Sequence, residues 1–398
     1  MHSEIKVRSG AVFMIIALVL CLLIPSVRIP FGGHAYKAAY HGRSLASFPQ
    51  SSGLILKPEA YFRDFQNWYD DRVGFALLAG WARRRVSYYW FKDSPAPNIV
   101  LGKSGMIFLS AHSPVSDLSA IEHSCPPAEE WPVIYDQVEA DWRRIEQRFR
   151  REGLTPHLLI FPSKKALYAE QLPEKVPASL RRRCRDIRHQ DSPIIRLSEA
   201  FPGSVTDAYP VLQPHKNNRH FYPAENFHAD GEAAIRSVDA VVRQLRNQGD
   251  GSKPLPQYRI EKSKSDLSHV MGFSLPNFIR QLPEFDPSSL QIETAFERSA
   301  QSLLGEPVWS RRYRNPDALH DEKVMLITNS FGVRAAPYFA RHFSQVDIVS
   351  TNRIRGPARH KLFYETLVFN GGYNHIVFVL HDESVFKHRL GKLATGLE

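Results

Sequence analysis

The chain has 398 residues, of which 43% are hydrophobic and 11% aromatic, and this composition suffices for one large core or two smaller ones. Its formal net charge is +10, but the basic runs at residues 82–85 and 181–185 are short and fall in helical patterns, which indicates solvated helix faces. The sequence has no zinc-finger spacing, aromatic RNA-binding signature or long basic tail, which argues against a nucleic-acid-binding protein.

The N-terminal region contains an apolar run at residues 11–27, preceded by Lys6 and Arg8. At about 17 residues this run is near the lower limit for a membrane span and long for the apolar part of a signal peptide. No small-x-small cleavage site follows it. We therefore expect residues 1–30 to be an uncleaved signal anchor, one transmembrane helix with the bulk of the chain outside the cytoplasm.

Two cysteines, Cys125 and Cys184, lie outside this apolar run. In an oxidising compartment they could pair and close a loop of about 60 residues, which would stabilise the fold by roughly 3–4 kcal/mol. Two free thiols are the alternative, and the sequence leaves both open.

The rest of the chain alternates between two kinds of pattern. Residues 31–97 predict a juxtamembrane linker and aromatic-rich helices, and residues 98–110 predict a hairpin that turns between Gly102 and Gly105. Apolar runs predict strands at 154–162, 193–197, 323–328, 346–349 and 375–380, and helical patterns cover 133–151, 230–247, 332–343 and 358–369. This alternation predicts an α/β domain over residues 98–398, with a mostly parallel sheet flanked by helices and an inserted segment at 249–320.

Polar side chains follow three of the predicted strands. Ser163 and Lys164 follow the first strand, Asn329 and Ser330 follow the strand at 323–328, and His381, Asp382 and Glu383 follow the last one. Ligands of parallel sheets bind beyond the carboxyl ends of the strands, so these residues are expected to surround a site.

Ser330 is the candidate nucleophile. It stands where a strand pattern changes at once into a helix pattern, which would hold its hydroxyl at the edge of the sheet. A serine needs a base, and His228 is the candidate because Asn226, two residues earlier on an extended segment, would face the same side. Asp230 reads as the N-cap of the following helix. The alternative is that Asn226 is a turn residue and His228 a buried or capping histidine.

Six segments, taken in order, resemble the alginate O-acetyltransferase family of bacterial exopolysaccharide modification, whose members carry a domain similar to SGNH hydrolases. These segments are residues 98–109, 158–173, 225–234, 265–273, 326–332 and 375–384. The second resembles the family's Pro-x-Lys segment with Lys164, the fourth its Asp-Leu segment, and the last ends at Glu383 like the family's C-terminal strand. The resemblance implies an SGNH hydrolase-like fold for residues 98–398.

The resemblance also implies roles for individual residues. Ser330 matches the nucleophile and His228 the general base, while Asn226 stands where relatives have the acid of the triad. An amide can accept from the imidazole Nδ1–H but supplies no negative charge, so a weakly active or inactive member is an open alternative. Asp230 and Glu225 are near enough in sequence to replace the acid. Asn329 replaces the Asp that precedes the nucleophile, and Ala229 replaces a Trp.

The implied function is transfer of an acetyl group through a serine acyl-enzyme to hydroxyls of an exopolysaccharide, without a cofactor. A polysaccharide-binding or scaffolding protein and a carbohydrate esterase are the alternatives. No metal is expected, because His215, His220 and His228 match no strong ligand spacing. The implied partners are the polysaccharide and a membrane-bound acyltransferase, with the protein anchored in the bacterial inner membrane and its soluble domain in the periplasm.

Overall fold

The computed structural model describes residues 46–50, 54, 57–70, 74–111, 118–217, 221–246, 259–271, 276–281, 289–305 and 308–397. The predicted membrane segment at residues 11–27 lies outside these ranges. Within them, no helix combines the length and apolar character that a membrane span needs.

The chain divides into two compact units, of which the smaller comprises Met1–Ala96 and Ser268–Ser274. Its described helices are α4 (Pro58–Asp70), α5 (Gly74–Tyr89) and α13 (Ser268–Met271). Phe48 packs edge-on against Trp68, with ring centroids 4.8 Å apart. The helices predicted from the aromatic spacing are therefore found here.

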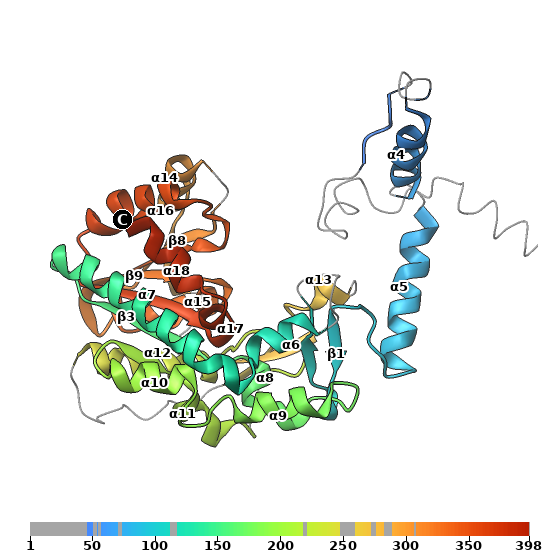
Figure 1. Cartoon of the computed structure of the whole chain (residues 1–398). Helices are drawn as coiled ribbons and strands as arrows, with labels where there is room; N and C mark the ends of the chain where they lie inside the picture. Colours follow the sequence, from blue (N-terminus) through green and yellow to red (C-terminus); the bar gives the residue numbers. More distant parts are fainter. Residues whose placement is uncertain are drawn as a thin grey trace, which may run out of the picture. The chain divides into compact units, whose positions relative to one another are not determined.

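The larger unit, Pro97–Leu267 with Leu275–Glu398, is built on a seven-stranded sheet (Figure 1). Its strands are β3 (Pro156–Phe161), β4 (Val205–Asp207), β7 (Gln291–Glu293), β8 (Ser310–Arg314), β9 (His320–Thr328), β10 (Phe343–Ser350) and β11 (His375–His381). The spatial order is β4-β3-β11-β9-β10-β8-β7, in which the first five strands are parallel and the last two pairings are antiparallel. The last strand in sequence, β11, thus lies in the interior of the sheet between β3 and β9.

Helices cover both faces of the sheet, as the alternating pattern predicted (Figure 1). On one face are α8 (Lys164–Leu167), α9 (Ala178–Asp186), α11 (Tyr209–Leu212), α12 (Glu232–Leu245) and α15 (Ser330–Phe339); on the other are α7 (Trp131–Arg151), α10 (Pro193–Ala200), α14 (Thr294–Leu304), α16 (Pro357–Phe363) and α18 (Arg389–Ala394). Each face has its own apolar core, and alternate residues of the strands point into one or the other. A mixed α/β fold with a mostly parallel sheet is therefore confirmed.

Shorter elements join this framework. They are the hairpin β1 (Ile99–Leu101) and β2 (Ile107–Leu109), the hairpin β5 (Arg259–Lys264) and β6 (Pro276–Gln281), α6 (Ser119–Ser124), a π-helical turn at Tyr364–Phe369 and α17 (Asp382–Phe386). The first hairpin was predicted with its turn.

Three predicted elements differ from the structure. Residues 193–197 were predicted as a strand but begin helix α10, because Ser192 accepts a hydrogen bond from the Ile195 N–H (3.5 Å) and Pro193 has the φ of a first helical position. The helix predicted from Asp230 begins at Glu232, and its N-cap is Gly231, whose φ of 52° favours glycine. Within the predicted insertion at 249–320, β7 and β8 extend the main sheet.

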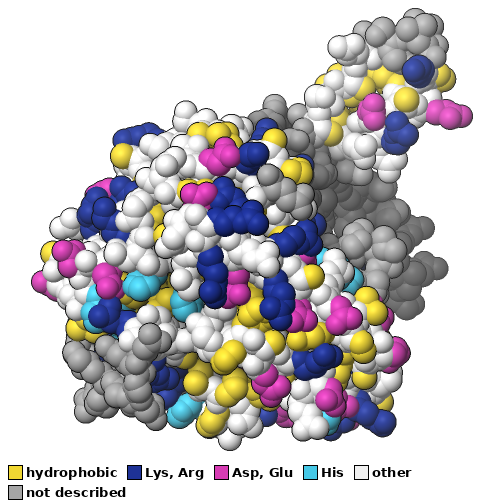
Figure 2. Space-filling view, turned by 60° about the vertical axis from the view of Figure 1, so that its left-hand side comes forward, with side chains coloured by type: hydrophobic (Ala, Val, Ile, Leu, Met, Phe, Trp, Pro, Cys, Tyr) yellow, Lys and Arg dark blue, Asp and Glu magenta, His cyan; other side chains and the backbone are white. Residues whose placement is uncertain are grey.

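The surface in Figure 2 carries Lys and Arg side chains interspersed with Asp and Glu on the face shown. Several of the described pairs lie on helices at i, i+4 spacing, such as Arg143 with Glu139 at 2.7 Å. The basic runs seen in the sequence fall on α5 and α9, where Arg83, Arg85, Arg182 and Arg185 are exposed, as predicted. Arg84, Arg181 and Arg183 are partly buried.

Candidate active site

Ser330 is the first residue of α15, and only Asn329 separates it from Thr328, the last residue of β9. Asn329 is the N-cap of this helix, and its Oδ1 accepts the Phe331 N–H at 2.9 Å. Gly332 allows the helix to lie against β9, because a Cβ at this position would be 1.8 Å from Thr328 Oγ1. The abrupt turn between strand and helix therefore holds the partly exposed Ser330 at the carboxyl edge of the sheet.

The side chain of Asn329 has a fixed orientation. Its Nδ2 lies 2.7 Å from His381 Nδ1 and donates to Ser384 Oγ at 2.9 Å. These contacts require Nδ2 to be the donor, which leaves Oδ1 to cap the helix. His381 at the end of β11 and Ser384 on α17 thus orient the residue before Ser330, and Asn329 acts as a helix cap.

His228 is bound to the carboxylate of Asp266. Its Nδ1 lies 2.6 Å from Asp266 Oδ2, and the backbone N–H groups of Phe227 and His228 donate to the same carboxylate at 2.8 and 3.2 Å. Burial alone would raise the pKa of Asp266, but the His228 ring and these two amides hold that pKa below its ordinary value. Asp266 is therefore an ionised acceptor that orients the imidazole.

The other ring nitrogen of His228 is available. Nε2 is buried and has no hydrogen-bond partner within the described part of the chain, so Ser330 Oγ is not bonded to it in this structure. The imidazole is nevertheless adjacent to the start of α15, since its ring centroid lies 4.7 Å from that of Phe331, the residue after Ser330. Catalytic hydrogen bonds are often long before substrate binds.

Asn226 does not have the role expected of it as the residue that orients the imidazole. Its Oδ1 accepts the Asp266 N–H at 3.0 Å, and Asp266 occupies the position on His228 Nδ1. Sequence reasoning missed Asp266 as the acid, because it lies 38 residues after His228. The available signal was the resemblance of residues 265–273 to the family's Asp-Leu segment.

Asp230 and Glu225, the other acids considered for this position, lie elsewhere. Asp230 is buried, accepts the Gly231 N–H at 2.8 Å and has Arg334 at 3.6 Å. Burial raises the pKa of Asp230, and Arg334 only partly opposes this. The backbone carbonyl of Glu225 accepts from the Ser265 hydroxyl.

Lys164, which the strand-end rule predicted at the site, contacts the loop that leads to His228. Its Nζ donates to the carbonyls of Pro223, Ala224 and Asn226 at 2.9, 2.7 and 2.9 Å. Burial lowers the pKa of Lys164 to about 7, although the carboxylates of Asp266 and Glu225 act in the opposite direction. Lys164 thus belongs to the surroundings of the candidate base.

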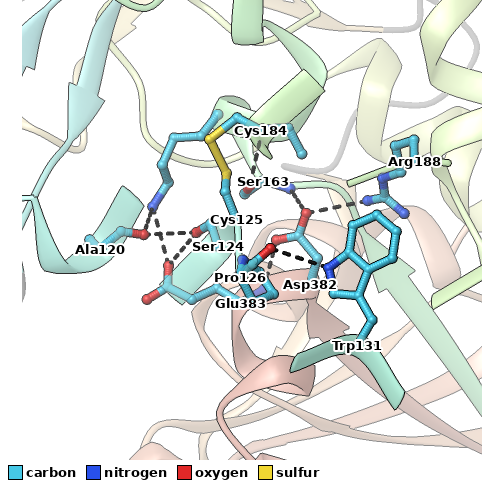
Figure 3. The surroundings of a disulfide bond; sticks show 12 residues. Ala120, Ser124, Cys125, Pro126, Trp131, Ser163, Cys184, Arg188, Asp382 and Glu383 are labelled. Carbon is cyan, nitrogen blue, oxygen red and sulfur yellow. Dashed lines mark hydrogen bonds and ion pairs between the residues drawn. A yellow bond between two sulfur atoms is a disulfide. The ribbon is translucent and has the colours of Figure 1, made fainter. Parts of the chain in front are cut away.

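Glu383 belongs to a buried ionic network beside the disulfide Cys125–Cys184 (Figure 3). Its Oε2 lies 3.2 Å from Lys165 Nζ and accepts from Ser124 Oγ at 3.1 Å. The preceding Asp382 accepts the Ser163 N–H at 2.8 Å and pairs with Arg188 at 3.2 Å. Of the two alternatives for the cysteines, the structure has the pair, which joins α6 to α9.

The described residues contain no group of three or more His, Cys, Asp or Glu side chains that could hold a metal ion. His228 and Asn226 meet at Asp266, and the His228 ring packs against Phe331, the residue that follows Ser330. The arrangement can abstract a proton at His228 Nε2 and stabilise the resulting imidazolium through Asp266.

Comparisons with known proteins give matches among solved structures alone. No family model and no curated protein matches the sequence. The chain is similar to a DHHW family protein from Eubacterium siraeum (TM-score 0.44, 14% identity, 66% of this chain and 88% of the other). It is also similar to the O-acetyltransferase domain of Pseudomonas putida AlgJ (0.46, 14%, 75% and 99%) and to Bacillus cereus PatB1 (0.39, 11%, 63% and 91%). An O-acetyltransferase domain is thus among the structures to which this chain is similar.

Proposed function

We propose that this protein is a serine acyltransferase that moves an acetyl group to hydroxyls of a bacterial exopolysaccharide. The observation that supports it best is the His228 imidazole, which Asp266 holds through Nδ1 at 2.6 Å. Its Nε2 is buried and has no partner in the described part of the chain, and the ring lies beside the start of α15. A carboxylate on Nδ1, with Nε2 left for the proton of the nucleophile, is the arrangement of the general base in serine acyl transfer.

In the first half-reaction, Ser330 Oγ attacks the carbonyl carbon of the acetyl donor while His228 Nε2 takes the hydroxyl proton. The bond between the carbonyl carbon and the leaving group then breaks, and the leaving group takes the proton from the imidazolium. Asp266 stays ionised and stabilises the positive ring between these two steps. The product is an acetyl ester on Ser330.

The negative charge that develops on the carbonyl oxygen requires donors. The first turn of the ten-residue helix α15 offers backbone N–H groups and the positive end of the helix dipole. The Phe331 N–H is already bonded to Asn329, so the Ser330 N–H is the nearest amide left for this task.

In the second half-reaction, His228 removes a proton from a sugar hydroxyl, which attacks the ester and releases Ser330. Water in place of the sugar would make the protein an esterase. In the proposed setting, a membrane-bound acyltransferase supplies the acetyl groups, and the apolar run at residues 11–27 anchors the protein in the inner membrane. The disulfide between Cys125 and Cys184 would suit a periplasmic location.

The proposal is tested with the full-length protein and its Ser330→Ala and His228→Ala variants. Hydrolysis of an activated acetyl ester should fall in both variants by about 10³-fold or more. Mass spectrometry of an added oligosaccharide then distinguishes acetyl transfer from simple hydrolysis. Equal background rates in all three proteins would refute the catalytic proposal and favour a binding or scaffolding role.

A further inference from the structure

Lys164 and Lys165 are neighbours on α8, and each is only 1% exposed, but their surroundings differ. Lys165 is an ion pair with Glu383 at 3.2 Å and also donates to the Ala120 carbonyl at 2.7 Å. For Lys164, no carboxylate within the described ranges lies at ion-pair distance. A buried ammonium group without a counter-ion is costly, so a local role must compensate for its cost.

All three N–H bonds of the Lys164 ammonium group go to a single loop. They reach the carbonyls of Pro223, Ala224 and Asn226, at 2.7 to 2.9 Å. The fourth carbonyl of this loop, that of Glu225, accepts from the Ser265 hydroxyl. Every backbone carbonyl of residues 223–226 therefore has a donor, and Lys164 donates to three of them. The Pro223 carbonyl also accepts the Asn226 N–H, and the Ala224 carbonyl the Ile107 N–H of β2, so Lys164 adds a second donor to these two and is itself the donor to the Asn226 carbonyl.

This loop determines where the candidate base stands. Asn226 Oδ1 accepts the Asp266 N–H, and the next two amides of the loop, those of Phe227 and His228, donate to the Asp266 carboxylate. The positions of the carbonyls fix the directions of these amides, because peptide units are planar. A shift of the loop would move both Asp266 and the imidazole.

We propose that Lys164 is a positioning residue, whose ammonium group holds residues 223–226 so that Asp266 directs the His228 imidazole toward Ser330. Its effect on rate rests on the proposed function, whereas its effect on the contact between His228 and Asp266 does not. A neutral amine has two N–H bonds and a lone pair, so deprotonation would set that lone pair against one of the three carbonyl oxygens.

The groups facing Lys164 Nζ come from three segments. They are the carboxylates of Glu225 and Asp266 and the ring of Phe108 on β2, whose centroid is 5.7 Å away. Since burial lowers the pKa of Lys164 to about 7, the ammonium form is lost as pH rises through neutrality. The positioning effect should weaken over that range.

The test compares Lys164→Met with Lys165→Met in the full-length protein labelled with ¹⁵N-histidine. The first readout is the downfield proton signal of His228 Nδ1, assigned by its absence in His228→Gln. The second is kcat for the activated ester. In Lys164→Met, the signal should be lost and kcat should fall about 10- to 100-fold, the size of effect that a misplaced group has. Lys165→Met should lower Tm but keep the proton signal. Its rate should decline at the same pH as that of the wild type, because Lys164 is still present.

Each other outcome is decisive. An unchanged signal and rate in Lys164→Met overturn the inference, as does equal loss of the signal in both variants, which would indicate general packing. A lost rate with an unchanged signal would indicate contact with substrate instead.

A second test applies if Lys164→Met does not fold. The wild type should then lose the signal between about pH 6 and 8 while Lys164→Arg retains it, since arginine stays protonated. A signal that persists in the wild type would refute the role. If the wild type has no ester activity, the proposed function fails while the proton signal still tests Lys164.

Discussion

Both edges of the parallel sheet carry histidines paired with carboxylates, but the pairs are arranged differently. At the amino edge, His342 Nε2 lies 2.7 Å from Asp239 and His375 Nε2 lies 3.0 Å from Glu322. At the carboxyl edge, His381 Nε2 lies 3.6 Å from Glu383, whereas His228 is bound through Nδ1 and its Nε2 has no partner among the described residues.

The difference teaches which histidine can act as a base. Nε2 is the ring nitrogen farther from the backbone, so a carboxylate there closes the outer end of the side chain, whereas a carboxylate on Nδ1 fixes the ring and leaves its outer end accessible. The pairs at the amino edge fit a structural role. Of the pairs at the carboxyl edge, the one between His228 and Asp266 fits proton transfer.

The largest expected effect comes from comparing two short histidine–carboxylate contacts, His228 with Asp266 and His342 with Asp239. Asp266→Asn should lower the rate of ester hydrolysis by about 10³- to 10⁴-fold, because the imidazolium loses its counter-charge and the ring its orientation. Asp239→Asn should leave that rate unchanged within about twofold. Kinetic assays of both variants at one pH check the contrast, and similar losses in the two would show that the edges do not differ in function.

The second prediction concerns the disulfide at the carboxyl edge. Replacing both Cys125 and Cys184 by Ser should lower the free energy of unfolding by about 4 kcal/mol, since the disulfide joins residues 59 positions apart. Urea denaturation of the variant and of the wild type, with and without reductant, measures this. A loss below about 1 kcal/mol would mean that the ionic network around Glu383 holds α6 without the disulfide.

The third prediction concerns the amino edge, where His157 is the second residue of β3 and has its Nδ1 buried and without a partner among the described residues. Burial lowers the pKa of His157 to about 4, helped by nearby His375. The unfolded chain therefore binds more protons between pH 6.5 and 4, and stability falls as pH decreases across that window, by up to about 3 kcal/mol. His157→Leu should remove this part of the acid dependence in urea titrations at pH 7 and 5 without changing kcat at pH 7. An unchanged acid dependence would indicate that His157 is protonated in the folded protein.

The smallest effect is expected for Gly332→Ala, with about 2 kcal/mol lost from stability. The added Cβ overlaps the buried Thr328 side chain, which has Val379 behind it and little room to move. Because the helix must shift, the rate of ester hydrolysis should fall as well. Val333→Ala on the same helix, at a partly exposed position, is the control, with little change in rate. Equal rates for wild type and Gly332→Ala would show that Ser330 tolerates displacement of α15.

The sequence predicted the parts of the fold that depend on local pattern. The apolar runs at 323–328 and 375–380 are long and buried on both sides, which is typical of interior parallel strands, and they became β9 and β11. The apolar run at 193–197 is too short for its spacing to distinguish a strand from a helix. It forms a helix because Ser192 caps the N-terminus and Pro193 is the first helical residue.

The site was predictable only in part. Ser330, His228 and Lys164 stand next to recognisable strand or helix ends, so local pattern selected them. The pairing of Asp266 with His228 depends on how two loops distant in sequence pack together, and the spacing of apolar residues carries no information about this. The contacts of Lys164 could not be predicted either, because they are made to backbone carbonyls, which have no sequence signature.

The place of β11 in the sheet has a consequence for synthesis of the protein. Until residues 375–381 leave the ribosome, β4 and β3 have no edge in common with β9, β10, β8 and β7. A chain cut short before residue 375 would therefore contain two unjoined half-sheets with exposed apolar edges, a form prone to aggregation and proteolysis. Joining the strand that leads to the serine with the strands on the other side of the sheet therefore requires residues 375–381.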